Sequence, residues 1–324
     1  MDIDISVLRL LEREKEIPFD DLVNIIESAI LAAFSKTGVE AKGARAELDR
    51  KTGHVTIYAP ELNEEGEQVG ETDVTPEGFG RVAAYAAKQV IAQRMREISD
   101  EGLLGEFKGK EGDIVAGVIQ QGSRSNMVYV NLGSIEALMP PEEQVPGEDY
   151  SHGSRIRVYV TSVQRGPRGP QITVSRTHPN LVRKLFALEV PEVASGQVEI
   201  ASVAREAGHR TKIAVIAKEP GINAKGACIG ELGQRVRAVS AELNEEKIDV
   251  VDFSEDLPRF VAQALSPARV SDAFVIDAAT KAVRVLVPDF QLSLAIGKEG
   301  QNARLAAKLT GAKIDIQPDS ILEG

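Results

Sequence analysis

The sequence predicts a multidomain α+β protein, with an α/β N-terminal domain, a five-stranded β-barrel and two tandem α+β domains. Three observations predict this: helix-period apolar stripes flank a hairpin near the N-terminus, five short strand-like runs follow, and one block of sequence occurs twice in the last third. The length of 324 residues suggests two to four domains, and an aromatic content of only 4% favours small units. The expected domains are residues 1–104, 105–178, 179–252 and 253–324.

The N-terminal segment has the patterns of two helices and a hairpin. Apolar residues recur at the helix period over residues 22–34. A glycine-containing turn between two strand-like runs predicts a hairpin over residues 45–59. Thr75 is expected to be an N-cap with Pro76 at the first helical position. An apolar stripe over residues 79–91 then predicts a long helix that ends near Ile98, and glycine-rich residues 102–112 predict a domain boundary.

Short strand-like runs fill the next domain. Turns rich in Gly, Pro and Ser separate the runs, which is typical of a small barrel. The runs are residues 113–120, 127–132, 135–139, 155–160 and 171–176. Gly117 and the segment Val130-Asn131-Leu132-Gly133 resemble the OB-fold of the ribosomal S1 type.

One strand of this barrel has the composition of a nucleic-acid-binding surface. Alternation over residues 155–160 places three β-branched residues on one face and Arg155, Arg157 and Tyr159 on the other. Arginines neutralise phosphates and an exposed tyrosine stacks on a base, so this face is expected to bind RNA. Tyr129, between two valines, is expected to add a second stacking surface. The alternative is a solvated face on which the arginines have no role.

The repeated block contains a Gly-x-x-Gly motif in a matched context. Ile229–Arg237 leads to the strand Lys247–Val250, and Ile296–Arg304 leads to Lys313–Ile316. The motif occurs five times in the chain, so its spacing alone is not specific. Only these two copies follow a β-branched strand and a short apolar helix, and precede a helix that begins Gln-x-x-Arg.

A glycine-containing turn between two helices allows close approach of the backbone to a phosphate, because no Cβ obstructs it. The second helix directs its free N–H groups and its positive dipole end at the same anion. Both copies therefore resemble the KH domain, which binds single-stranded nucleic acid. The alternative is two ordinary α+β repeats with glycine-capped helices. A dinucleotide-binding loop is disfavoured, because the glycines at 226, 230 and 233 lack the G-x-G-x-x-G spacing and do not directly follow a strand.

The two copies differ in charge. Lys298 places a cation in the second loop, whereas Glu231 and Leu232 occupy the first, so a weaker phosphate contact is expected there. Basic residues beside the first loop are expected to compensate. The residues expected to bind RNA are Tyr129, Arg155, Arg157, Tyr159, Lys225, Gly230, Gly233, Arg235, Arg237, Gly297, Lys298, Gly300, Gln301, Asn302 and Arg304.

The net charge of −11 does not exclude RNA binding, because its distribution is uneven. Residues 1–105 carry 12 basic and 21 acidic side chains, which accounts for most of the excess. Phosphates interact mainly with charges within about 8 Å at physiological salt, so a local basic face is sufficient.

Other compositional features exclude several classes of protein. A single cysteine excludes an internal disulfide, and the N-terminus has no secretory pattern, so a cytoplasmic protein without a membrane span is expected. The four histidines are scattered without metal-ligand spacing, and no catalytic constellation is evident. Neither a metal, nor a cofactor, nor enzymatic activity is expected.

The order of the domains resembles the bacterial NusA family of transcription elongation, pausing, termination and antitermination factors. The segment Val287–Arg304 is the most specific part of this resemblance, and Asn223–Gly230 and the opening residues through Phe34 add to it. The resemblance implies a monomer whose N-terminal domain docks on the RNA polymerase core. It also implies that the barrel and the KH pair bind nascent RNA, and that other elongation or antitermination factors join. An RNA-processing or ribosome-associated protein with the same modules is the alternative.

Overall fold

The computed structural model describes residues 2–15, 17–39, 41–64, 66–120 and 126–322. The chain divides into two compact units, Met1–Gly105 and Glu106–Gly324. None of the helices in the described part of the chain combines the length and the apolar character needed to cross a bilayer.

The N-terminal unit packs helices on an antiparallel three-stranded sheet. Ile26 and Ile30 of α2 are fully buried in a core shared with Ile57 of β2 and Ala83 of α3. The strand order is β1-β2-β3. The elements are α1 (Ile5–Lys15), α2 (Phe19–Phe34), β1 (Arg45–Leu48), β2 (Val55–Leu62), β3 (Gln68–Asp73) and α3 (Gly80–Lys108).

Two predictions for this segment need correction. The helix α3 begins at Gly80 and not at Pro76, and the Thr75 hydroxyl accepts from the Ile57 amide of β2 at 2.8 Å. The helix continues to Lys108, past its expected end at residue 98, and Gly102 and Gly105 lie inside it. A glycine in a helix costs only about 1 kcal/mol, and the helix ends where Phe107 becomes buried. The strand β3 was not predicted, because its exposed and mostly polar residues lack an apolar alternation.

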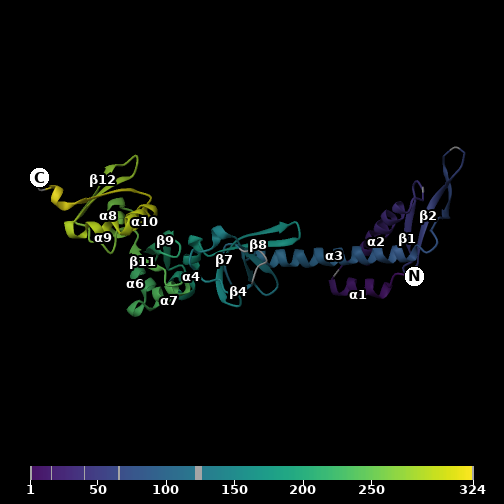
Figure 1. The fold of residues 1–324 in the computed structure, drawn as a ribbon, viewed down its shortest axis with the longest axis horizontal. Coiled ribbons are helices and arrows are strands. Elements are labelled where there is room, and N and C mark those ends of the chain that lie inside the picture. The colour runs from purple at the N-terminus through teal and green to yellow at the C-terminus, as the bar shows by residue number, and fades with distance from the viewer. Residues whose placement is uncertain (1, 16, 40, 65, 121–125, 323–324) are drawn as a thin grey trace. The chain divides into compact units, whose positions relative to one another are not determined.

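The second unit begins with a closed five-stranded barrel of order β4-β5-β6-β8-β7, which confirms the predicted barrel (Figure 1). A Cβ on Gly117 would lie 2.5 Å from Val130 Cγ1, so the close approach of β4 and β5 there requires glycine. The strands are β4 (Ile114–Gln120), β5 (Val128–Asn131), β6 (Glu136–Met139), β7 (Arg155–Gly166) and β8 (Gly169–Ser175).

The first α+β repeat has a sheet of order β11-β10-β9, in which β10 pairs antiparallel with β9 and parallel with β11. Its buried residues join those of the α4 helix in one apolar core. The elements are α4 (Pro179–Glu189), α5 (Pro191–Ala194), β9 (Val198–Glu206), β10 (Arg210–Ala217), α6 (Ala224–Ile229), α7 (Gln234–Glu242) and β11 (Lys247–Asp252).

The second repeat has the same topology, with β13 antiparallel to β12 and parallel to β14. The aspartate of each repeated Lys-Ile-Asp segment pairs with a cation of the central strand: Lys212 Nζ lies 2.9 Å from Asp249, and Arg284 Nε lies 2.8 Å from Asp315. The elements are α8 (Leu257–Ala264), β12 (Asp272–Asp277), β13 (Ala282–Val287), α9 (Leu292–Ile296), α10 (Gln301–Thr310) and β14 (Lys313–Pro318).

Candidate nucleic-acid interface

The two Gly-x-x-Gly loops have the same backbone conformation. In each loop the first glycine is extended at positive φ, and the third and fourth residues are left-handed. The φ and ψ angles are 75° and 172° for Gly230, 49° and 25° for Leu232, 76° and 16° for Gly233, 78° and 170° for Gly297, 54° and 27° for Glu299, and 73° and 12° for Gly300. The loops join α6 to α7 and α9 to α10, as the repeat predicts.

Both loops are accessible, and the first glycine of each is required by packing. A Cβ on Gly297 would lie 2.8 Å from the backbone nitrogen of Asn302, and a Cβ on Gly230 would lie 2.7 Å from Arg235 Cγ. Lys298 and Leu232, at the tips of the loops, are exposed. A phosphate can therefore approach the backbone here without obstruction by a side chain at the glycines.

The structure places two of the predicted RNA contacts beneath the loops. Asn302 is only 1% exposed, and its Nδ2 donates to the carbonyls of Leu265 (2.9 Å) and Ala295 (3.0 Å). The prediction that the Asn302 side chain contacts RNA is therefore wrong. Arg235, five residues after the first glycine as Asn302 is in the other copy, donates from Nη1 to the Ala227 carbonyl (2.8 Å). Both side chains fix a loop to the helix before it.

The Arg304 guanidinium is paired within the protein. Its Nε lies 2.6 Å from Glu206 Oε1, and Gln301 Nε2 donates to Glu206 Oε2 at 2.9 Å. These hydrogen bonds, the one from Arg304 above all, lower the pKa of Glu206 to about 2. Glu206 ends β9 in the first repeat, so the first turn of α10 is fixed to the neighbouring domain.

Three cations at the loops have no ion-pair partner among the described residues. Among the described residues, Lys298, Lys225 and Arg237 have no carboxylate within ion-pair distance, whereas Arg235 lies 2.9 Å from Glu192. Lys298 and Arg237 are exposed, and Lys225 is half-buried. These three side chains are available to a phosphate without breaking an internal ion pair.

The barrel face differs from the prediction at one residue. Arg155 and Arg157 are exposed on β7, and Arg157 Nη1 lies 2.7 Å from Glu242 of α7.

Tyr159 is only 8% exposed: its ring stacks on His178 at 4.5 Å, and its hydroxyl accepts from Asn180 Nδ2. The prediction that Tyr159 offers an exposed stacking surface is therefore wrong. Both faces of β7 are covered at this position, so the consecutive residues Val158, Tyr159 and Val160 are all buried. Tyr129 of β5 is half-buried.

A buried charged network that the sequence analysis missed joins the barrel to the first repeat. Arg176, 2% exposed, pairs with Glu148 of the barrel, and its Nη2 donates to the Glu242 carbonyl at 2.8 Å. Its Nη1 donates to the carbonyl of Arg157 at 2.9 Å. The backbone that carries Arg157 is therefore attached to the first repeat through one arginine.

A second buried pair lies next to this network. Glu246 is bidentate to Arg205, with both oxygens at 2.9 Å, and also accepts from Thr211 and from the Gly208 amide. Burial alone would raise the pKa of Glu246, but the hydrogen bonds from Arg205 and Thr211 outweigh it, so the pKa is lowered. Alternation within strands does not reveal such pairs, because the partners are distant in sequence and each arginine alone resembles a surface residue.

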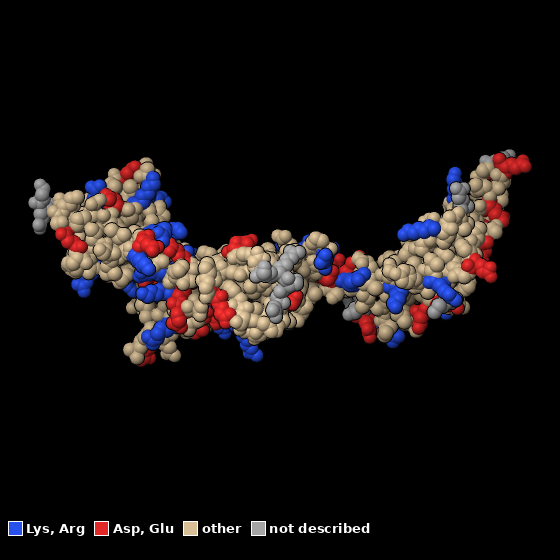
Figure 2. Space-filling view, viewed as in Figure 1, with Lys and Arg blue, Asp and Glu red and all other residues tan. Residues whose placement is uncertain are grey.

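Charge on the visible face of the repeats is mixed. In Figure 2, basic and acidic side chains alternate over the region of the two repeats, without a large surface of one sign. The described residues also contain no group of three or more His, Cys, Asp or Glu side chains arranged to hold a metal ion.

Sequence comparison with known proteins identifies the family of this chain. A protein of Mycobacterium tuberculosis named transcription termination/antitermination protein NusA is 57% identical over 327 residues, covering 99% of this chain and 94% of that protein. The chain belongs to the NusA family. The NusA protein of Bacillus subtilis is 45% identical, and the match covers 98% of this chain and 91% of that protein. The NusA protein of Thermus thermophilus is 43% identical over 267 residues, covering 82% of this chain and 67% of that protein.

Models of the individual NusA domains match in the predicted order. The NusA N-terminal domain matches residues 5–63, and the S1 RNA binding domain matches residues 108–175. The NusA-like first and second KH domains match residues 176–253 and 257–323. The predicted fold class and the resemblance to the NusA family are confirmed, and the repeats are hereafter called KH1 and KH2. The exact domain boundaries and the individual RNA contacts remain predictions.

Proposed function

We propose that this chain is an RNA-binding transcription factor that modulates pausing, termination and antitermination while docked on RNA polymerase. Its NusA relatives are named transcription termination/antitermination proteins, and the S1 and KH domains are RNA-binding modules. The proposal makes it a non-catalytic, cytoplasmic monomer. Its partners are the polymerase core, single-stranded nascent RNA and other elongation or antitermination factors.

The observation that carries the RNA-binding proposal is the identical backbone of the two glycine loops. Each loop precedes a helix of at least nine residues, so the N–H groups and the dipole of that helix favour an anion at the loop. In KH2, Lys298 adds an exposed cation that has no ion-pair partner among the described residues. On the S1 barrel, Arg155 adds an exposed arginine. Three domains that each bind weakly are sufficient if the protein is held beside the emerging transcript.

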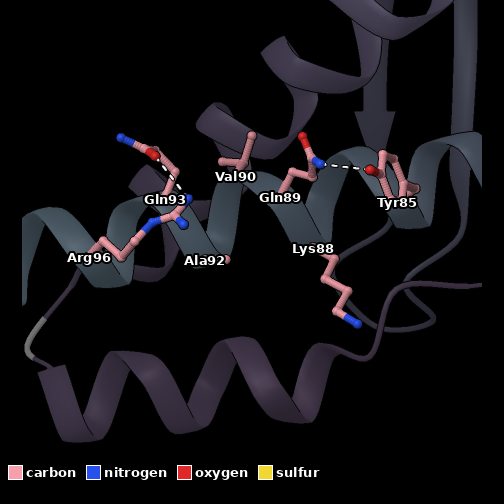
Figure 3. A pocket seen from close by; sticks show the side chains of 7 residues that line it. All are labelled: Tyr85, Lys88, Gln89, Val90, Ala92, Gln93 and Arg96. Carbon is pink, nitrogen blue, oxygen red and sulfur yellow. Dashed lines mark hydrogen bonds between the residues drawn. The ribbon is translucent and has the colours of Figure 1, made fainter. Parts of the chain in front are cut away.

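We assign the docking on polymerase to the N-terminal unit. Along α3, Tyr85 is 65% exposed and Val82 is 42% exposed, which is a large apolar exposure for a helix. Tyr85 accepts a hydrogen bond from Gln89 Nε2 at 2.8 Å, which orients its ring at the edge of a pocket also lined by Lys88 and Arg96 (Figure 3). An apolar surface with basic neighbours suits an acidic amphipathic element of a protein partner.

Lys298→Glu is expected to weaken RNA binding and to reduce its salt dependence. Each lost phosphate contact lowers the slope of log affinity against log salt by about 0.7 for single-stranded RNA, because fewer counterions are released. The measurement is the affinity for an unstructured RNA across a range of salt concentrations. Lys51→Glu, at an exposed turn of the N-terminal unit, changes the net charge equally and is the control. An unchanged slope for Lys298→Glu would contradict the phosphate contact.

An RNA-processing or ribosome-associated protein would use the same S1 and KH modules. The names of the relatives support the transcriptional role and not this alternative. Co-purification with RNA polymerase under conditions that remove RNA separates the two functions, because only the transcription factor binds polymerase directly.

A further inference from the structure

The tip of the KH1 loop exposes an apolar side chain. Leu232 is 87% exposed, more than any other large apolar residue among those described. Its φ of 49° and ψ of 25° place a branched residue in the left-handed region, which is unfavourable relative to a right-handed helical conformation. The Leu232 side chain does not belong to the apolar core of KH1, so packing in that core explains neither its exposure nor its backbone conformation.

The KH2 loop has the same backbone but the opposite chemistry. Glu231 replaces the cation Lys298, and Leu232 replaces Glu299. A carboxylate at the Lys298 position repels a phosphate. The nearby Arg235 does not compensate, because its Nη1 is already shared between Glu192 and the Ala227 carbonyl. The KH1 loop is therefore expected to bind a phosphate more weakly than the KH2 loop, although the two loops share one backbone conformation.

We propose that the KH1 loop contacts an unstacked nucleobase of single-stranded RNA through Leu232, while the KH2 loop contacts the phosphate backbone through Lys298. This inference rests on the proposed RNA-binding function. Unpaired bases present apolar faces to a protein irrespective of sequence, and an exposed leucine offers a complementary surface. Lys225 and Arg237 lie on the two helices that flank the loop and have no ion-pair partner among the described residues, so they attract the RNA despite Glu231.

The test compares substitutions in the two loops of the full chain. Leu232→Asn removes the apolar surface, and asparagine tolerates the left-handed conformation, so the fold is retained. We expect its affinity for an unstructured RNA of mixed sequence to fall about fivefold with an unchanged salt slope, since no counterion contact is lost. Leu232→Met keeps an apolar side chain and is expected to keep the affinity. Leu62→Asn, at a 61% exposed leucine of the N-terminal unit, is the matched control.

A second ligand identifies the base as the contact. An abasic oligomer with the same phosphoribose backbone is expected to bind the unsubstituted chain and Leu232→Asn equally. Three results would overturn the inference: an unchanged RNA affinity of Leu232→Asn, a reduced salt slope like that of Lys298→Glu, or an equal loss of affinity for the abasic oligomer. A failure of the unsubstituted chain to bind any RNA would instead refute the proposed function itself.

Discussion

Glu246→Ala is expected to lower the free energy of unfolding of KH1 by about 3–5 kcal/mol. The substitution leaves Arg205, whose side chain is only 1% exposed, as a buried charge without a partner. It also removes the acceptor of the Thr211 hydroxyl and of the Gly208 amide. Hydrogen exchange of the β10 and β11 amides measures the change within KH1, which avoids assuming that the whole chain unfolds in one step.

The control for this prediction is an exposed ion pair of the same domain. Lys218 and Glu199 pair on the surface with both side chains about half exposed, at 53% and 51%, so Glu199→Ala is expected to cost less than about 1 kcal/mol. Replacing both buried partners, as in Arg205→Met with Glu246→Leu, is expected to recover much of the loss, because no charge is then left buried. A cost below about 1 kcal/mol for Glu246→Ala would contradict the role assigned to the pair.

Removal of residues 1–104 is expected to abolish the effect on transcriptional pausing while leaving weak RNA binding. In the proposed mechanism the N-terminal unit keeps the RNA-binding domains beside the transcript, at an effective concentration in the millimolar range for a short linker. The measurement is the lifetime of a defined pause with the full chain or with residues 105–324 at equal concentration. Phe107, which is 1% exposed, remains in the shortened chain, so the core of the second unit is preserved.

Two controls separate loss of docking from loss of folding. The RNA affinity of residues 105–324 must stay measurable, and its hydrogen-exchange protection must match that of the full chain. Tyr85→Asp in the full chain places a charge on the exposed α3 surface and is expected to reduce the effect on pausing in the same direction. An undiminished effect on pausing after the deletion would refute the tethering mechanism.

Local patterns were sufficient to predict the architecture. The Gly-x-x-Gly spacing identified two loops only because each follows a β-branched strand and precedes a Gln-x-x-Arg helix, and the structure gives both loops the same angles. The barrel was predictable from short runs separated by turn residues. Both signals are encoded within a few residues, so no knowledge of tertiary contacts was needed.

The surface chemistry was harder to predict, because it depends on partners distant in sequence. Alternation placed Tyr159 opposite the barrel core, but it could not reveal that His178 stacks on that ring. Asn302 and Arg304 both resembled RNA contacts, yet one is buried and the other pairs with Glu206, 98 residues away. A cation within a binding motif therefore indicates a phosphate contact only after its internal partners are known.

The attachment of α10 to β9 has a consequence for RNA secondary structure. Glu206 holds Arg304 and Gln301, which directly follow the KH2 loop, so the separation of the two loops is fixed by the protein. An RNA that reaches both loops must span this separation as an extended strand, whereas a base-paired stem is more compact per nucleotide and presents no free bases. Occupation of both loops and closure of a stem in the same stretch of RNA are then mutually exclusive. A protein that binds RNA through both loops would in this way respond to whether the emerging RNA has begun to fold.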